Sequence, residues 1–153
     1  MIFQPTWPTT VLRDILTGST WRRDGVARQH VVPMPIATGM PVYTPDDLMD
    51  GAMPGGTVVI FDDDHYYMGG VLAELLARSG CHVTLVTPAA YVSDWTRNTL
   101  EQATIHRRLA EMGVVLQLNR GIMEIAGDHV VTNCVYTDQT HTEYCDAVVL
   151  VTS

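Results

Sequence analysis

A run of acidic and aromatic residues between Asp62 and Gly70 contains the side chains best suited to chemistry in this chain. Carboxylates and a histidine follow one another there, and such side chains bind divalent cations: Asp62, Asp63, Asp64 and His65. Four consecutive residues cannot all point at one ion, and magnesium or calcium would need further oxygen ligands from elsewhere. We therefore expect no metal site in this run.

Paired aspartates at a strand end are also typical of phospho-receiver domains, which hold magnesium beside a phosphate-accepting aspartate. Such a domain needs an acceptor aspartate after its third strand and a lysine after its fifth. Here the third expected strand runs into Asn119 and Arg120, and all nine basic residues are arginine. The sequence therefore excludes a receiver domain, and the lack of lysine also excludes a P-loop and a Schiff base.

The same run stands where a dinucleotide-binding domain has its G-x-G-x-x-G turn, between the first strand and the first helix. Glycines there let the backbone approach the pyrophosphate, and the helix N-terminus faces the anion. Counting back from Gly80 places Gly69 at the third glycine, which packs helix against strand, whereas carboxylates replace the two phosphate-facing glycines. Negative charge at that position would repel a pyrophosphate.

The end of the next strand gives a second indication against a dinucleotide. NAD usually finds an acidic residue there and NADP an arginine, but this chain has Thr87 and Pro88. We interpret the run as a degenerate dinucleotide turn, an exposed helix-capping acidic loop with Tyr66 and Tyr67 packed over the sheet edge. A functional NAD(P)H site is the alternative. The candidate cofactor-contacting residues are Asp62, Asp64, His65, Tyr66, Gly69 and Gly70.

No other set of residues predicts catalysis. No serine or cysteine lies in a G-x-S-x-G turn, and no histidine stands at a characteristic spacing from one. Cys81, Cys134 and Cys145 are too few for a four-cysteine iron–sulfur or zinc site, so we expect free thiols. Residues 21–24 could bind an anion or form an interface, but a surface ion pair between an arginine and Asp24 is the simpler interpretation.

The elements that position the acidic turn alternate along the chain. Short β-branched runs at 57–61, 82–87 and 114–118 predict buried strands, and the spacing of apolar residues predicts helices at 69–79 and about 98–112. This order of strands and helices is the unit of a parallel sheet with right-handed crossovers.

After the third strand the apolar residues alternate, which predicts strands at 122–126 and 129–136 joined by a turn at 127–128. A third strand near 141–145 completes an antiparallel meander, and an apolar strand at 147–151 returns to the parallel sheet. The predicted fold class is α/β: a three-layer Rossmann-like parallel sheet (βαβαβ) with a three-stranded antiparallel β-meander.

Residues 1–56 are rich in proline, glycine and threonine and have little periodicity. Within them we expect a strand at 11–16 and a short helix at 44–49. Thr44 can cap that helix, and Pro45 suits its first position.

The composition limits the classes of partner. The 153 residues are 46% hydrophobic and 17% charged, as in an ordinary globular domain. A net charge of -8 without a basic tract argues against nucleic acid and anionic membranes. No apolar run approaches the ~20 residues that a bilayer requires, and the first residues lack the pattern of a secretion signal. We therefore expect a cytoplasmic protein.

Residues 58–74, which contain the acidic turn, resemble the C-terminal part of the trimethylamine dehydrogenase family. These are FMN- and iron–sulfur-containing amine dehydrogenases and demethylases, related to NADH:flavin oxidoreductases and 2,4-dienoyl-CoA reductases. The family also has a long, glycine-poor turn with a tyrosine–aromatic–methionine run. Residues 16–25, 44–51, 98–101 and 107–109 are similar to its neighbouring segments, so the resemblance covers nearly the whole chain.

The resemblance implies that the chain is a fragment of a larger oxidoreductase. In that family a barrel holds FMN, cysteines hold a [4Fe-4S] cluster, and two nucleotide-binding-type domains follow, one of which holds ADP or FAD. Residues 1–56 would then belong to the flanking FAD/ADP-type domain, with Gly18 at the edge of its site, and residues 57–153 to the NAD-type domain.

The resemblance also implies partners. They are the rest of the same polypeptide and an electron-transferring flavoprotein that accepts the electrons. The chain by itself would then be non-catalytic, with a structural or acceptor-docking role. The alternative is a functional NAD(P)H-binding domain, as in the 2,4-dienoyl-CoA reductases.

Overall fold

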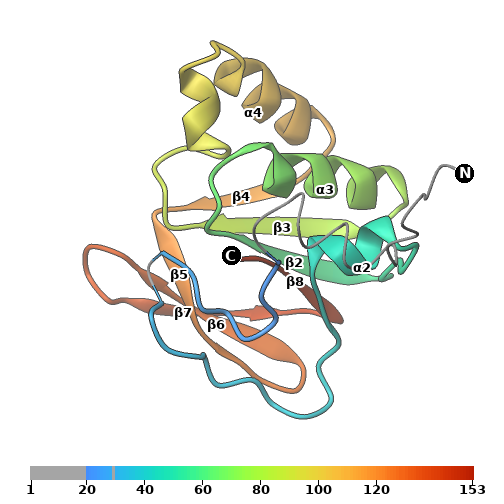
Figure 1. The fold of residues 1–153 in the computed structure, drawn as a ribbon, viewed down its shortest axis with the longest axis vertical. Coiled ribbons are helices and arrows are strands. Elements are labelled where there is room, and N and C mark those ends of the chain that lie inside the picture. Colours follow the sequence, from blue (N-terminus) through green and yellow to red (C-terminus); the bar gives the residue numbers. More distant parts are fainter. Residues whose placement is uncertain (1–19, 29) are drawn as a thin grey trace, which may run out of the picture.

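The computed structural model describes residues 20–28 and 30–153, and these form three layers (Figure 1). Helices cover one face of a five-stranded parallel sheet, and a separate three-stranded antiparallel sheet lies on the other side. The predicted α/β fold class, with its parallel sheet and its meander, is confirmed. The strand expected at 11–16 and the candidate residue Gly18 lie outside the described residues.

The parallel sheet has the strand order β1-β8-β2-β3-β4, and all neighbouring pairs are parallel. Its strands are β1 (Val42–Tyr43), β2 (Thr57–Asp62), β3 (His82–Thr87), β4 (Val115–Leu118) and β8 (Ala147–Val151). The last strand returns to this sheet, as predicted, and lies between β1 and β2. The carboxyl ends of β2, β3 and β8 therefore share one edge.

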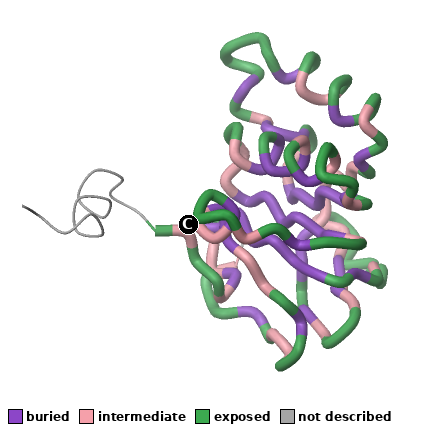
Figure 2. The backbone as a smooth tube through the Cα atoms, turned by 90° about the vertical axis from the view of Figure 1, so that its right-hand side faces the viewer, coloured by how far each residue is buried: buried purple, intermediate pink, exposed green. Residues whose placement is uncertain are grey.

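The central strand β2 is buried because each of its faces packs against a different layer. Val58 and Ile60 belong to the core under the helices, whereas Val59 and Phe61 belong to the core shared with the antiparallel sheet. Figure 2 shows the buried residues concentrated in the middle of the molecule, between the helices and the outer sheet. A strand with two buried faces has a continuous run of apolar residues, and this run allowed the strand to be predicted from the sequence.

The first two helices begin and end at signals that the sequence contains. α2 (Pro45–Met49) begins after Thr44, whose backbone N–H and hydroxyl both donate to the Asp47 carboxylate (2.7 and 2.9 Å). α3 (Tyr67–Arg78) begins two residues earlier than predicted and ends before Gly80, which has a φ of +91°. Among the described residues, no helix is long and apolar enough to cross a membrane.

The helix predicted at 98–112 is shorter than expected and follows a separate turn. A 3-10 helix, η1 (Asp94–Arg97), comes first, and α4 (Gln102–Glu111) follows. Leu100, between them, has a φ of 64°. An α-helix cannot continue through that left-handed conformation, so the two helical segments remain distinct.

The antiparallel sheet consists of β5 (Arg120–Ile125), β6 (His129–Cys134) and β7 (Thr140–Tyr144), in that order. The turn predicted at 127–128 does join β5 to β6. β6 ends two residues earlier than predicted, because the Asp138 N–H donates to the last carbonyl of the strand (3.0 Å) and closes a turn there.

Residues 20–28 and 30–41 contain no helix and no strand. They contact the antiparallel sheet through an isolated bridge between Ile36 and Ile125. Residues 42–43, within the segment assigned to the flanking domain, form β1 and pair with β8. The division of the chain at residue 56 stays a prediction.

Candidate functional site

Residues 62–66 connect β2 to α3 at the carboxyl edge of the parallel sheet, where cofactors bind in this class of fold. The structure brings together in this turn, and in the first turn of α3, the predicted site residues Asp62, Asp64, His65, Tyr66, Gly69 and Gly70.

Asp62 is fully buried at the end of β2. Its Oδ1 accepts hydrogen bonds from the backbone N–H groups of Asp64 (3.2 Å) and His65 (3.0 Å), which bends the chain sharply after the strand. Among the described residues its Oδ2 has no hydrogen-bond partner, and burial raises the pKa of this carboxyl to about 6. The prediction of an exposed acidic loop is therefore wrong at this residue, because the carboxylate stabilises the turn from inside.

Asp63 also turns inward and is buried. Its Oδ1 lies 3.1 Å from Nε2 of His65, and its backbone N–H donates to the Val151 carbonyl (3.2 Å), which ties the turn to β8. His65 itself has a φ of 67°. Of the three aspartates only Asp64 is partly exposed, so the turn presents much less negative charge to solvent than the sequence suggested.

The two glycines let α3 approach its neighbours closely. A Cβ on Gly69 would lie 2.4 Å from Oδ2 of Asp62, and one on Gly70 would lie 3.0 Å from Oγ of Ser93. Both glycines are buried. Gly69 thus packs α3 against the end of β2, and Gly70 packs it against the segment that follows β3.

Tyr66 and Tyr67 contact the segment after β3 rather than the sheet edge predicted for them. The ring of Tyr66 stacks on that of Trp95, with centroids 5.6 Å apart and planes 4° apart. The Tyr67 hydroxyl donates to Oε2 of Glu101 (2.5 Å). Both tyrosines therefore have partners in the segment between β3 and α4, and both are about half exposed.

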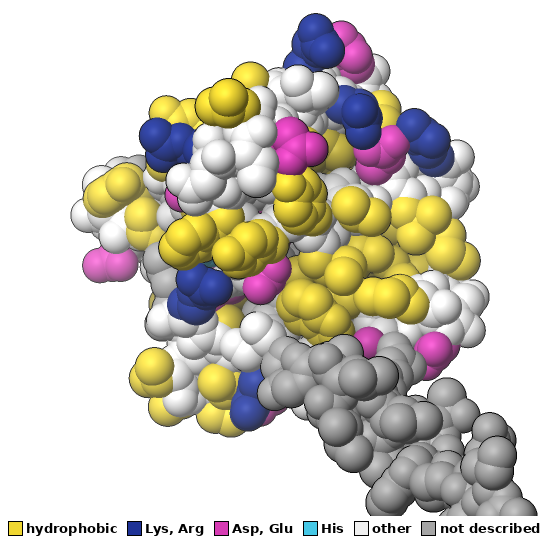
Figure 3. Space-filling model, turned by 45° about the horizontal axis from the view of Figure 1, so that its top comes forward, with side chains coloured by type: hydrophobic (Ala, Val, Ile, Leu, Met, Phe, Trp, Pro, Cys, Tyr) yellow, Lys and Arg dark blue, Asp and Glu magenta, His cyan; other side chains and the backbone are white. Residues whose placement is uncertain are grey.

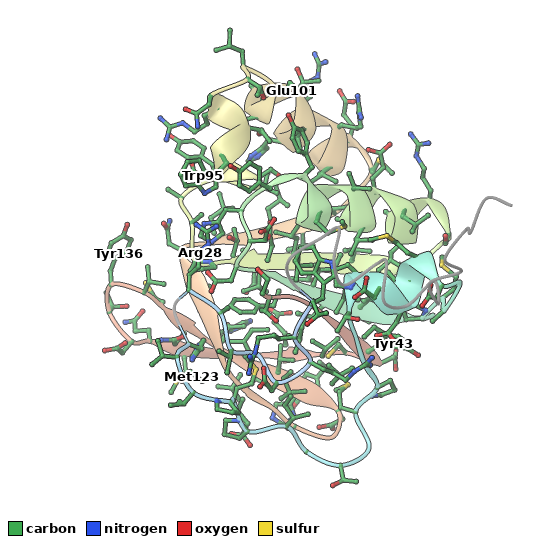
Figure 4. The ribbon with its side chains drawn as sticks, in the orientation of Figure 1. Arg28, Tyr43, Trp95, Glu101, Met123 and Tyr136 are labelled. Carbon is green, nitrogen blue, oxygen red and sulfur yellow. The ribbon has the colours of Figure 1, made fainter. Side chains whose placement is uncertain are left out.

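The segment between β3 and α4 covers the turn. The Trp95 N–H donates to the His65 carbonyl (3.1 Å), and Ser93 is buried with a φ of 50°. The guanidinium of Arg28 lies over the Trp95 ring, 5.9 Å from its centroid (Figure 4). Trp95 thus contacts the turn through its backbone and, through its ring, contacts Tyr66, the residue just before α3. Sequence reasoning missed it, because its only signal was a tryptophan among polar residues.

The predicted ion pair of an arginine with Asp24 is present, and a second arginine pairs with Asp47. Arg22 binds both carboxylate oxygens of Asp24 (3.0 and 2.6 Å). Arg23 donates to Asp47 and to the Val42 carbonyl, both at 2.7 Å. The contacts of Arg23 connect residues 20–24 to β1 and α2.

The described residues contain no group of three or more histidine, cysteine, aspartate or glutamate side chains that could hold a metal ion. The three cysteines are free, as predicted. A groove of about 250 Å³ lies between α3 and α4, lined by Tyr67, Val71, Leu100, Glu101 and other residues. In that groove Glu101 accepts hydrogen bonds from Tyr67 and from the adjacent Thr99.

Comparison with known proteins places the chain in a family. The family model described as the OYE-like second alpha/beta domain matches residues 43–150. The chain is 29% identical to dimethylamine dehydrogenase of Hyphomicrobium sp. (strain x), over 91% of the chain and 22% of that protein.

Two solved structures are similar over most of the chain. Histamine dehydrogenase from Rhizobium sp. 4-9 is 61% identical with a TM-score of 0.87, over 90% of this chain and 22% of that one. The 6-hydroxypseudooxynicotine amine oxidase from Pseudomonas geniculata N1 is 40% identical with a TM-score of 0.84, over 88% of this chain and 20% of that one. The chain thus spans about a fifth of the length of these relatives. The resemblance to trimethylamine dehydrogenase-like enzymes is confirmed.

Proposed function

The chain belongs to the family of OYE-like second α/β domains, and from this we propose that it is a domain of a larger amine-oxidising flavoprotein that has lost its dinucleotide. In this proposal the domain has a structural or docking role. The oxidation of the amine takes place elsewhere in the larger protein.

The observation that carries the proposal is the set of contacts that the turn between β2 and α3 makes within the chain. A dinucleotide needs free backbone N–H groups and an open helix N-terminus for its pyrophosphate. Here Oδ1 of Asp62 accepts the N–H groups of Asp64 and His65, and Trp95 is stacked on Tyr66 above them. These two N–H groups are therefore not free to bind phosphate, and we infer that the residues of the turn do not fit a dinucleotide.

The cofactors of the larger protein also need residues that this chain lacks. A [4Fe-4S] cluster requires four cysteine thiolates, and the chain has three cysteines. We therefore assign FMN, the cluster and ADP or FAD to the remainder of the polypeptide. An electron-transferring flavoprotein is the proposed acceptor, which makes NAD unnecessary here.

Titration of the 153-residue chain with NADH and with NADPH tests the proposal. We expect no saturable change in nicotinamide fluorescence or in the heat of binding up to about 1 mM cofactor. A dissociation constant above that concentration corresponds to a binding free energy weaker than about -4 kcal/mol. Micromolar binding that is abolished by Gly69→Trp, in a variant that keeps its far-UV circular dichroism, would establish a functional NAD(P)H domain instead. Gly55→Ala is the matched control, because a Cβ on Gly55 meets no atom within 4 Å.

A further inference from the structure

Three aromatic rings and two arginines form a patch at the carboxyl edge of the parallel sheet, called here the aromatic–arginine cluster: Arg28, Tyr66, Tyr91, Trp95 and Arg97. The Tyr66 and Trp95 rings are stacked, Arg28 lies over Trp95, and the Arg97 guanidinium lies 4.8 Å from the centroid of the Tyr91 ring. The three rings are 42–46% exposed, so a large part of their surface is in contact with water.

Contacts within the chain restrain two members of the cluster, Trp95 and Arg97, without a partner. The Trp95 N–H is hydrogen-bonded to the turn, and Arg97 forms a 3.4 Å ion pair with Asp94. Tryptophan, tyrosine and arginine are the residue types that dominate protein–protein binding energy. Stacked rings lose little conformational entropy on binding, which favours association.

The charge of the cluster is not balanced within the described part of the chain. Arg28 is exposed and forms no ion pair there, although Arg22, Arg23, Arg78 and Arg108 each have a carboxylate within 4 Å. A binding surface opposite the cluster would therefore present a carboxylate to Arg28 and apolar groups to the rings.

The two ends of the described chain meet at this same edge. The Arg22 N–H donates to the Thr152 carbonyl, and the Thr152 hydroxyl donates to the Arg22 carbonyl, both at 2.8 Å. Figure 4 shows Arg28 close to Trp95. The Asp63 N–H donates to the Val151 carbonyl, and the Trp95 N–H donates to the His65 carbonyl, so the end of β8 adjoins the same turn that Trp95 contacts. Polypeptide that continued from residue 153 would thus begin at the same edge of the sheet as the cluster.

We propose that the aromatic–arginine cluster is the contact surface for the flanking part of the same larger polypeptide. In dinucleotide-binding domains this edge of the sheet binds a cofactor, whereas here it serves as an interdomain interface. The relatives are long enough to supply such a partner, since the chain spans only 20–22% of their length. The inference rests on the proposed function, because a bound dinucleotide would need the same space.

A second exposed apolar area lies over the helices (Figure 3). It includes Val71, Leu75 and Leu100, which are 56%, 40% and 89% exposed. This area belongs to α3 and to the loop before α4, not to the edge at which the chain ends meet. This apolar area therefore does not lie beside the chain end, whose position favours the cluster as the interface.

Hydroxyl-radical footprinting of the 153-residue chain and of the full-length polypeptide tests the interface. We expect the oxidation rates of Tyr66 and Trp95 to fall about fourfold or more in the full-length protein, since interface cores lose nearly all of their exposed area. Tyr136, which is 78% exposed on the β6–β7 turn, is the reference. A loss at the cluster that is no greater than the loss at Tyr136 overturns the proposal.

Charge reversal gives a second measurement. Arg28→Glu in the full-length polypeptide should return the oxidation of Trp95 toward its rate in the isolated chain, because a carboxylate would then face a carboxylate. Arg78→Glu is the matched control, since Arg78 is exposed on the last turn of α3 and pairs with Glu74. An equal response to both variants contradicts the proposal. Titrating the same samples with NADH separates the two claims, because cofactor binding would overturn the proposed function whatever the footprint.

Discussion

At the scale of single residues, Asp62 carries the most testable chemistry. Burial raises its pKa to about 6 in the folded protein, against an ordinary value of 3.8. The folded protein therefore holds the proton more tightly than the unfolded chain does. The stabilising contribution of protonated Asp62 is complete below pH 3.8 and is lost as the pH rises through about 6.

We expect Asp62→Asn to be more favourable for stability, relative to the wild type, at about pH 8 than at about pH 4. The change in the free energy of unfolding should differ between the two pH values by roughly 2–3 kcal/mol, which corresponds to about two pKa units. The asparagine keeps an oxygen that can accept the N–H groups of Asp64 and His65 and removes the buried charge. Urea denaturation at both pH values measures the difference.

Asp64→Asn is the matched control for that experiment. It removes one negative charge from the same turn, but Asp64 is only half-buried. We expect the pH dependence of its difference from the wild type to be smaller than that of Asp62→Asn, because burial of Asp62 is the largest cause of the raised pKa of that carboxyl. An Asp62→Asn curve parallel to the wild-type curve would show that Asp62 ionises freely in the folded protein.

The residue scale also shows where sequence reasoning stopped. The acidic residues of the turn and Gly69 were visible as residue types, and their place at a strand end followed from the pattern. Their orientation did not follow, because it depends on backbone N–H groups of the turn and on His65, which only the folded chain brings within 3.2 Å.

At the scale of elements, the loop between η1 and α4 contains a strained residue. Leu100 has a φ of 64°, a conformation that costs an L-residue with a Cβ about 1–2 kcal/mol. Its side chain is 89% exposed, so little burial is lost on substitution. We expect Leu100→Gly to raise the free energy of unfolding by about 0.5–1 kcal/mol, because glycine adopts positive φ without that strain.

Leu75→Gly is the contrasting change. Leu75 lies within α3 and is 40% exposed, and glycine in a helix interior lowers stability by about 1 kcal/mol relative to alanine. Equilibrium unfolding in urea should therefore move in opposite directions for the two substitutions. A loss of stability in both would mean that Leu100 is not strained.

Element boundaries were predictable where a local signal sets them. Thr44 and Pro45 mark the start of α2, and Gly80 follows the end of α3. The break at Leu100 has no such signal, since leucine normally favours helix. Packing of the segment over the first turn of α3 overrides that preference.

At the scale of the whole molecule, Phe61 joins two layers. It is fully buried in the core that β2 shares with the antiparallel sheet. We expect Phe61→Ala to lower the free energy of unfolding by about 3–5 kcal/mol, from lost burial and the cavity left behind. Because both sheets share this core, the far-UV and near-UV circular dichroism signals should be lost in one transition.

Tyr136→Ala is the control for that measurement. Tyr136 is 78% exposed, and surface substitutions of this kind change stability by about 0.5 kcal/mol or less. Two separate transitions in the Phe61→Ala variant would indicate that the sheets unfold independently.

The sequence by itself determined the α/β order, the meander and the similarity to amine dehydrogenases, because periodicity and turn residues are local properties of the chain. It also placed the candidate turn at a strand end. Only the tertiary structure decided that Asp62 and Asp63 are buried and that Trp95 covers the turn. Those outcomes depend on contacts between residues some thirty positions apart, such as the Tyr66–Trp95 stack and the Trp95–His65 hydrogen bond, which no local pattern encodes.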